Sequence, residues 1–246
     1  LVITSILRSG ASTGAQLVAV NNSLVAKIYD PLYCYSSDDR DVVACAEQAY
    51  CHEAAAYSHL QKHSEISLNL STSLIEHGLK VVKSRDVHLI LIEYLRGVCM
   101  VNLDPYRLSE YVRWEILKQC IEAEIRMLYT GLDHSDFVPR NIIILGSDYH
   151  TPQLQVKVVD FEFCRLLAHP GYSNRKLGQR RMLAFKNMAP RVANPVQRYC
   201  GGLAAFADLG WCSDDRFSVQ EWLWDTFGND DRYVPAKWAL KRPGRV

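Results

Sequence analysis

Two stretches decide the fold: His134-Ser135-Asp136-Phe137-Val138-Pro139-Arg140-Asn141 and, further along, Val158-Val159-Asp160-Phe161-Glu162. The first holds a carboxylate and an asparagine in a polar loop, and the second places another carboxylate at the end of a short apolar run. Carboxylate and amide oxygens suit Mg²⁺, and a carboxylate can also orient or deprotonate a hydroxyl group. The two stretches therefore predict a magnesium-dependent site.

These motifs resemble the catalytic loop and the metal-binding loop of the protein-kinase-like superfamily. The resemblance extends over about residues 1 to 167. It implies an α+β, two-lobed fold, with an N-terminal antiparallel sheet lobe and a mainly helical C-terminal lobe. It also implies that Asp136 and Asn141 are catalytic, that Asn141 and Asp160 bind the metal, and that the cofactors are ATP and Mg²⁺. A structural Asp that caps a turn is the alternative for Asp136.

The residues around the motifs predict elements in a matching order. Alternating or continuous apolar runs predict strands, and longer runs with apolar residues at helical spacing predict helices. We expect strands over residues 1–7, 16–20, 24–29, 81–82, 87–94, 142–145 and 156–159, and helices over 41–61, 109–129 and much of the chain after 168. The expected lobes are residues 1–95, with five strands and one helix, and a reduced lobe over 96–246, with a connection at 95–97.

Two charged residues of the first lobe fit a phosphate-binding pair. Val25-Ala26-Lys27 resembles the strand lysine of the superfamily, which pairs with nucleotide phosphates; a surface lysine on an edge strand is the alternative. Glu53 is favoured over Glu47 as the helix carboxylate that orients Lys27. The run from Glu53 to Tyr57 resembles the same helix in aminoglycoside-phosphotransferase-like and fungal kinase-like proteins.

Further nucleotide contacts are expected at two places. Gly10 and Gly14 bracket Ala11-Ser12-Thr13, whose backbone and hydroxyl groups could contact phosphate; an ordinary hairpin turn explains the sequence equally well. Glu93 and Tyr94 lie where the resemblance places the connection between lobes, whose backbone groups hold the adenine edge.

The sequence departs from the protein-kinase pattern at the catalytic and metal loops. Val138 stands where protein kinases usually carry a lysine, and Arg140 can either substitute in part or point to solvent. Pro139-Arg140-Asn141 looks more like the phosphotransferase-like proteins of fungi. Glu162 stands where the superfamily usually has glycine, and either a further magnesium ligand or a solvated side chain fits it.

Composition excludes several classes of protein. The chain has 246 residues, 48% hydrophobic residues and a net charge of +1, so it lacks the strongly basic character of a nucleic-acid-binding protein. Its apolar runs are too short to cross a bilayer and no secretory signal is visible, which predicts a cytoplasmic protein with neither nucleic acid nor membrane as partner. The eight cysteines lack metal-site spacing and are expected to be buried or half-buried thiols.

Aromatic residues are expected to pack the helical lobe: Trp211, Trp222, Trp224, Phe227 and Trp238. Met188-Ala189-Pro190-Arg191 only faintly resembles the end of a kinase activation segment, and chance explains it better. The sequence thus favours a phosphotransferase that moves the γ-phosphate of ATP to a hydroxyl acceptor, either a protein Ser/Thr or a small molecule. The alternative is a pseudokinase, a nucleotide-binding or scaffolding module without turnover.

Overall fold

The computed structural model describes residues 1–10, 14–34, 41–63, 87–146, 149, 153–167 and 194–237. The chain divides into two compact units. The first consists of Leu1–Arg96 together with Asp160–Arg165, and the second consists of Gly97–Val159 together with Leu166–Val246. The metal-loop segment, Asp160–Arg165, thus belongs to the N-terminal unit. A division of the sequence at residue 95 assigns this segment to the other lobe.

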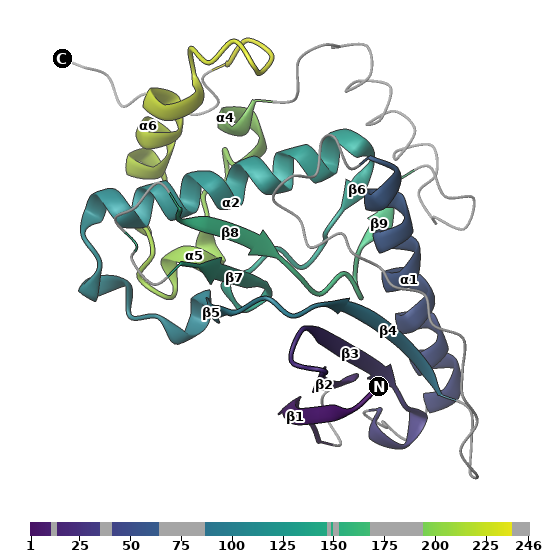
Figure 1. The fold of residues 1–246 in the computed structure, drawn as a ribbon. Helices are drawn as coiled ribbons and strands as arrows, with labels where there is room; N and C mark the ends of the chain where they lie inside the picture. Colours follow the sequence, from purple (N-terminus) through teal and green to yellow (C-terminus); the bar gives the residue numbers. More distant parts are fainter. Residues whose placement is uncertain are drawn as a thin grey trace, which may run out of the picture. The chain divides into compact units, whose positions relative to one another are not determined.

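The first unit is built on a four-stranded antiparallel sheet (Figure 1). Its strands are β1 (Ile3–Arg8), β2 (Gln16–Val20), β3 (Leu24–Tyr29) and β4 (His88–Glu93), in that spatial order. Asn21 and Asn22, between β2 and β3, both have positive φ, which asparagine tolerates and a tight hairpin turn requires. The predicted antiparallel sheet is confirmed; the proposed strand at Val81–Val82 lies outside the described residues.

Helix α1 (Val42–Lys62) contacts β3 and β4 (Figure 1). It begins where predicted, because the Asp41 side chain accepts hydrogen bonds from the backbone N–H groups of Val43 and Ala44. Ala56, Tyr57 and Leu60 are fully buried. The short helix η1 (Pro31–Tyr33) follows β3.

The second unit contains a three-stranded antiparallel sheet of β5 (Gly97–Cys99), β7 (Ile142–Leu145) and β8 (Gln155–Val158), with α2 (Glu110–Thr130) packed on β8 (Figure 1). The Ser109 hydroxyl caps α2, and Gly131 ends it in the left-handed conformation. The predicted helix and hairpin are confirmed. Strand β5 corrects the expectation of a plain connection at residues 95–97, since it pairs with β7 from Gly97 onward.

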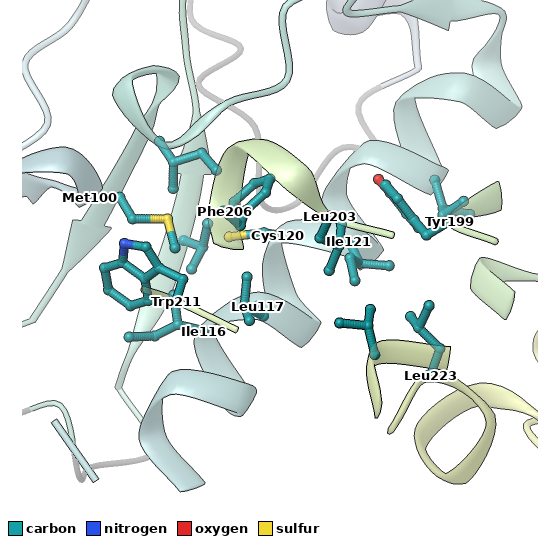
Figure 2. Packing of buried hydrophobic residues seen from close by; sticks show 14 of the residues in the cluster. Met100, Ile116, Leu117, Cys120, Ile121, Tyr199, Leu203, Phe206, Trp211 and Leu223 are labelled. Atoms are coloured by element: carbon teal, nitrogen blue, oxygen red, sulfur yellow. The ribbon is translucent and has the colours of Figure 1, made fainter. Parts of the chain in front are cut away.

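The core of the second unit gathers around the inner face of α2 (Figure 2). Ile116, Leu117, Cys120 and Ile121 point into it. They pack with residues from the C-terminal part of the chain, namely Tyr199, Leu203, Phe206, Trp211 and Leu223.

The remaining elements of the described chain are short. They are η2 (Met100–Asn102), η3 (Pro105–Arg107), β6 (Leu132–Asp133), η4 (Pro139–Asn141), β9 (Arg165–Leu166), α4 (Pro195–Arg198), α5 (Ala204–Ala207) and α6 (Arg216–Phe227). The predicted helical character after residue 168 holds for α4, α5 and α6.

The expected aromatic packing holds in the second unit. Trp211 and Phe227 are buried, and Trp222 and Trp224 are half-buried against the same core. Trp238 lies outside the described residues. All eight cysteines are free thiols, and Cys51 is exposed, contrary to expectation, because it lies on the solvent side of α1. Among the described residues, no helix is long and apolar enough to cross a membrane.

Candidate functional site

The first unit holds a buried lysine between two carboxylates. Lys27 lies on β3 and is only 6% exposed. Its Nζ donates to Glu53 Oε2 at 2.5 Å and to Asp160 Oδ1 at 2.6 Å. Glu53 comes from α1 and is also buried, whereas Glu47 is exposed. The structure thus brings together three of the predicted site residues, which lie far apart in the sequence.

The two carboxylates keep Lys27 charged. Burial alone would lower the pKa of the ammonium, but the charges of Glu53 and Asp160 outweigh burial and raise the pKa above its usual value. Lys27 is therefore a fixed positive charge over the whole physiological range. Such a charge, held by buried Glu53 and partly exposed Asp160, can pair with an anion such as a phosphate group.

Two tyrosines complete this cluster. The Tyr29 hydroxyl donates to Glu53 Oε2, the same oxygen that Lys27 binds. The Tyr57 hydroxyl is buried, and its ring meets Phe161 edge-on at 5.1 Å between centroids. Burial first, and then the charge of Glu53, raise the pKa of both phenols, so both stay neutral.

Neither tyrosine was predicted to be a site residue, although Tyr57 ends the helix motif that begins at Glu53 and two periodicities point to both. Tyr29 follows Lys27 by two positions on a strand, so the two side chains emerge on the same face. Tyr57 follows Glu53 by four positions on a helix, which again places the two on one face.

The segment after β8 brings two acidic residues into the first unit. Asp160 has a positive φ of 67°, a conformation that is uncommon for residues other than glycine. Glu162 faces the Gly14 turn: a Cβ added to Gly14 would lie 3.5 Å from both Glu162 carboxylate oxygens.

Glu162 is therefore not a freely solvated side chain. Burial is the main cause of a raised pKa for its carboxyl group; Lys27 opposes the shift, and Asp160 and Glu53 add to it.

The other predicted nucleotide-binding residues lie at the margins of the sheet. Gly10 exchanges two hydrogen bonds with the Gln16 side chain, and Gly14 has a φ of 69°. Ser12 and Thr13 lie outside the described residues. Glu93 ends β4 and is exposed, and the Tyr94 backbone N–H donates to Ser23 O at 2.9 Å. That amide is therefore already used within the sheet.

In the second unit, the loop after α2 holds Asp136 and Asn141 together. Asn141 is 3% exposed, and its Nδ2 donates to the backbone oxygen of Asp136 at 2.9 Å and to its Oδ2 at 2.8 Å. Buried His134 supports the loop through a contact of 3.1 Å between its Nε2 and Val159 O. Ser135 has a φ of 59°, which turns the chain between His134 and Asp136.

Arg140 is bound to Asp136 and does not simply point away. Its Nη2 lies 2.7 Å from Asp136 Oδ1 and 2.8 Å from Oδ2. The guanidinium side chain is nevertheless 62% exposed, whereas that of Asp136 is 20% exposed. The carboxylate therefore has three donor contacts, two from Arg140 and one from Asn141.

Two predicted ligands, one in each unit, offer oxygen atoms of the kind that magnesium prefers. Asp160 offers a partly exposed carboxylate, and the amide nitrogen of Asn141 is committed to Asp136, so its oxygen is the atom left for a cation. Mg²⁺ commonly uses one or two protein oxygens and completes its shell with water and phosphate. No group of three or more His, Cys, Asp or Glu side chains suited to a metal occurs among the described residues. A ligand-rich metal cage is thus absent from that part of the chain.

The comparisons with known proteins support the fold. No protein-family model matches the sequence, and no curated protein matches it. The Rio2 kinase–ADP/Mg²⁺–phosphoaspartate complex from Chaetomium thermophilum is similar in structure, with a TM-score of 0.51 and 17% identity over 94% of this chain and 64% of that one. The kinase WbdD has a TM-score of 0.49 and 11% identity over 96% of this chain and 48% of that one.

The chain spans less than two thirds of the length of either structure. At these identities the likeness concerns the fold alone. The chain has a protein-kinase-like fold, as its two loop motifs predicted.

Proposed function

We propose that this protein is a phosphotransferase that uses ATP and magnesium to phosphorylate a hydroxyl group. The observation that carries the proposal is the buried Lys27 held between Glu53 and Asp160. Burying the Lys27 ammonium and the Glu53 carboxylate carries a desolvation cost, so a buried pair of this kind is weak evidence for a purely stabilising role. The expected role of such a lysine is to bind the α- and β-phosphates, and that of Asp160 is to bind magnesium.

The proposed roles follow from the contacts of each residue. Glu53, with Tyr29 donating to the same oxygen, holds Lys27 in place. Asp160 and Asn141 would each offer an oxygen ligand to magnesium, which would neutralise charge on the phosphates. Asp136 orients the acceptor hydroxyl and takes its proton.

The transfer step forms one bond to phosphorus and breaks another. The acceptor oxygen forms a bond to the γ-phosphorus, and the bond from that phosphorus to the β–γ bridging oxygen breaks. ADP leaves with that electron pair, and the hydroxyl proton passes to the Asp136 carboxylate. Gly10, Gly14, Glu93 and Tyr94 are proposed as nucleotide contacts through their backbone groups. The Tyr94 contact involves its carbonyl, because its N–H is engaged within the sheet.

The second candidate is a nucleotide-binding module without turnover. Two observations favour it: Glu162 places a carboxylate beside the Gly14 turn, and Arg140 occupies both oxygens of Asp136. Against it, Asp136, Asn141 and Asp160 are all retained. We favour the enzyme because a binding module has no need of Asp136.

Release of ADP from ATP, with magnesium and a panel of hydroxyl acceptors, tests the proposal. Asp136→Asn is expected to lower kcat by roughly 10²-fold or more while the protein still binds ATP. Asp160→Asn is expected to lower both turnover and magnesium-dependent binding.

Asp231→Asn is the matched control, since Asp231 is exposed and lies far along the sequence from both loops. Equal turnover in wild type and Asp136→Asn would contradict the proposal that Asp136 acts in phosphoryl transfer. Magnesium-dependent ATP binding without turnover on any acceptor would support the binding module instead.

A further inference from the structure

Arg140 has an arrangement that the proposed transfer step does not use. Pro139–Asn141 form the short helix η4, with Asn141 N–H donating to Val138 O at 3.0 Å. The Cys99 thiol lies 3.2 Å from the backbone oxygen of Arg140. The backbone of Arg140 is thus fixed, while its guanidinium reaches back four residues to Asp136.

The guanidinium is only partly used. Its Nη2 serves both oxygens of Asp136. Arginine has five N–H donors, so the two on Nη1 and the one on Nε remain. These three N–H groups have no hydrogen-bond partner among the described residues, and the Arg140 side chain is 62% exposed. An exposed cation with unused single N–H donors on Nη1 and Nε therefore lies directly beside the proposed base.

We infer that Arg140 determines the acceptor: a small hydroxyl compound that carries a carboxylate or a phosphate near its hydroxyl group. This inference rests on the proposed phosphotransferase function. The anion of the acceptor accepts a hydrogen bond from Nη1 or Nε, since a hydrogen bond between a guanidinium and a carboxylate or phosphate oxygen is assisted by charge. Its hydroxyl then faces Asp136, which the same guanidinium holds in position.

The geometry limits the distance between the two groups of the acceptor. The Asp136 oxygens lie 2.7 and 2.8 Å from Nη2. A hydroxyl group bound to one of these oxygens and an anion bound to Nη1 or Nε are separated by roughly 5 Å. This is about the length of two hydrogen bonds. A small hydroxy acid or a polyol phosphate spans that distance. The side chains of a serine and an adjacent acidic residue in an extended peptide point to opposite sides, so the small compound is favoured.

The position of the cation agrees with this assignment. Val138 supplies no charge where protein kinases usually carry a lysine, and Arg140 is the charged side chain bound to Asp136 in the described structure. The cation of this loop therefore sits on the exposed side of the carboxylate.

Matched pairs of acceptors test the inference. ADP release would be measured with glycerol against glycerate, with glycerol against glycerol 3-phosphate, and with a serine peptide with and without acidic neighbours. Wild type is expected to show a kcat/KM about tenfold or more higher for the anionic small compound of each pair, mainly through KM.

Two variants of Arg140 and one control complete the experiment. Arg140→Gln is expected to bring the ratio between anionic and neutral acceptors close to one, and Arg140→Lys to restore part of it. The ratio is the readout, because a general loss of Asp136 positioning would slow both acceptors alike. Arg107→Gln, which alters an arginine that is 87% exposed on η3, is expected to leave the ratio unchanged.

The outcomes separate this inference from the proposed function. Turnover with equal kcat/KM for both members of each pair, or a ratio that survives in Arg140→Gln, would overturn the inference and leave the phosphotransferase standing. Turnover on the acidic peptide alone would also overturn it, since the acceptor would then be a protein. A wild type that releases ADP with no acceptor would overturn the proposed function and the inference with it.

Discussion

At the scale of single residues, two groups of polar contacts, one buried and one partly exposed, form the proposed site. In the first unit, Lys27 and Tyr29 both donate to one carboxylate oxygen of Glu53. In the second unit, Arg140 and Asn141 both donate to the carboxylate of Asp136. The first group depends on side chains of β3 and α1, and the second depends on side chains of one short loop. Substitutions that remove a single donor therefore test each group without disturbing the fold as a whole.

Tyr29→Phe removes the hydroxyl that donates to Glu53 and leaves the ring in place. The variant is expected to lose roughly 1–2 kcal/mol of unfolding free energy, because a hydrogen bond to a buried charged group is lost. It should also weaken magnesium–ATP binding severalfold, since Glu53 positions Lys27. Urea unfolding and calorimetry measure the two effects.

Tyr33→Phe provides the control, because Tyr33 is 42% exposed on η1. An unchanged ATP affinity in Tyr29→Phe, with the stability loss present, would show that Tyr29 serves the fold alone.

Glu124 is the anchor of a separate buried network in the second unit. It is 2% exposed and binds Arg198 Nη2 at 2.7 Å and the Tyr199 hydroxyl at 3.0 Å. Glu124→Leu is expected to cost about 3 kcal/mol of unfolding free energy, because a buried phenol and part of a guanidinium lose their acceptor. Glu115→Leu, on the more exposed side of the same helix, should cost well under 1 kcal/mol. Equal losses in chemical unfolding would contradict the structural role of Glu124.

At the scale of elements, glycine positions show where the chain has no room for a side chain. A Cβ on Gly97, in β5, would lie 2.4 Å from the backbone oxygen of Ile144 on β7. Gly97→Ala must therefore open the pairing of β5 and β7. We expect a loss of roughly 2–3 kcal/mol of unfolding free energy, as for other overpacking changes.

Gly201→Ala is the matched control, because no atom lies within 4 Å of the added Cβ. Thermal unfolding of the two variants should separate them by several degrees. Similar midpoints would mean that β5 does not pair as described.

Helix boundaries were predictable from the sequence because their caps are local. Asp41 and Ser109 each place a side-chain oxygen just before a helical run, and the structure begins α1 and α2 at the next residues. Strand β5 was not predictable, because a strand of three residues is too short to show a periodicity of its own. Its pairing depends on β7, which lies far along the sequence.

The candidate site was only partly predictable for the same reason. Residue type and spacing singled out Lys27, Glu53, Asp136, Asn141 and Asp160. Contacts between elements decided the rest: the Tyr29 hydroxyl on Glu53 and the Glu162 carboxylate beside Gly14 depend on how β3, α1 and the metal loop pack. The pairing of Arg140 with Asp136 lies within one loop, yet the sequence left its direction open.

At the scale of the whole molecule, the chain combines a kinase-like fold with departures at its loops. The fold agrees with that of a kinase of known structure. Val138, Arg140 and Glu162 alter the charges next to the proposed reacting groups. Among them, Arg140 is the basis of the acceptor proposed above.

Binding of ATP measured by calorimetry, with and without magnesium, tests the central claim that Lys27, held by Glu53 and Asp160, binds nucleotide phosphates. Wild type is expected to bind ATP in a magnesium-dependent manner, and Lys27→Met to weaken that binding roughly tenfold or more. Lys62→Met, which alters an exposed lysine at the end of α1, should bind as wild type does. A folded Lys27→Met variant with wild-type affinity, or a folded wild type that does not bind ATP, would contradict the account.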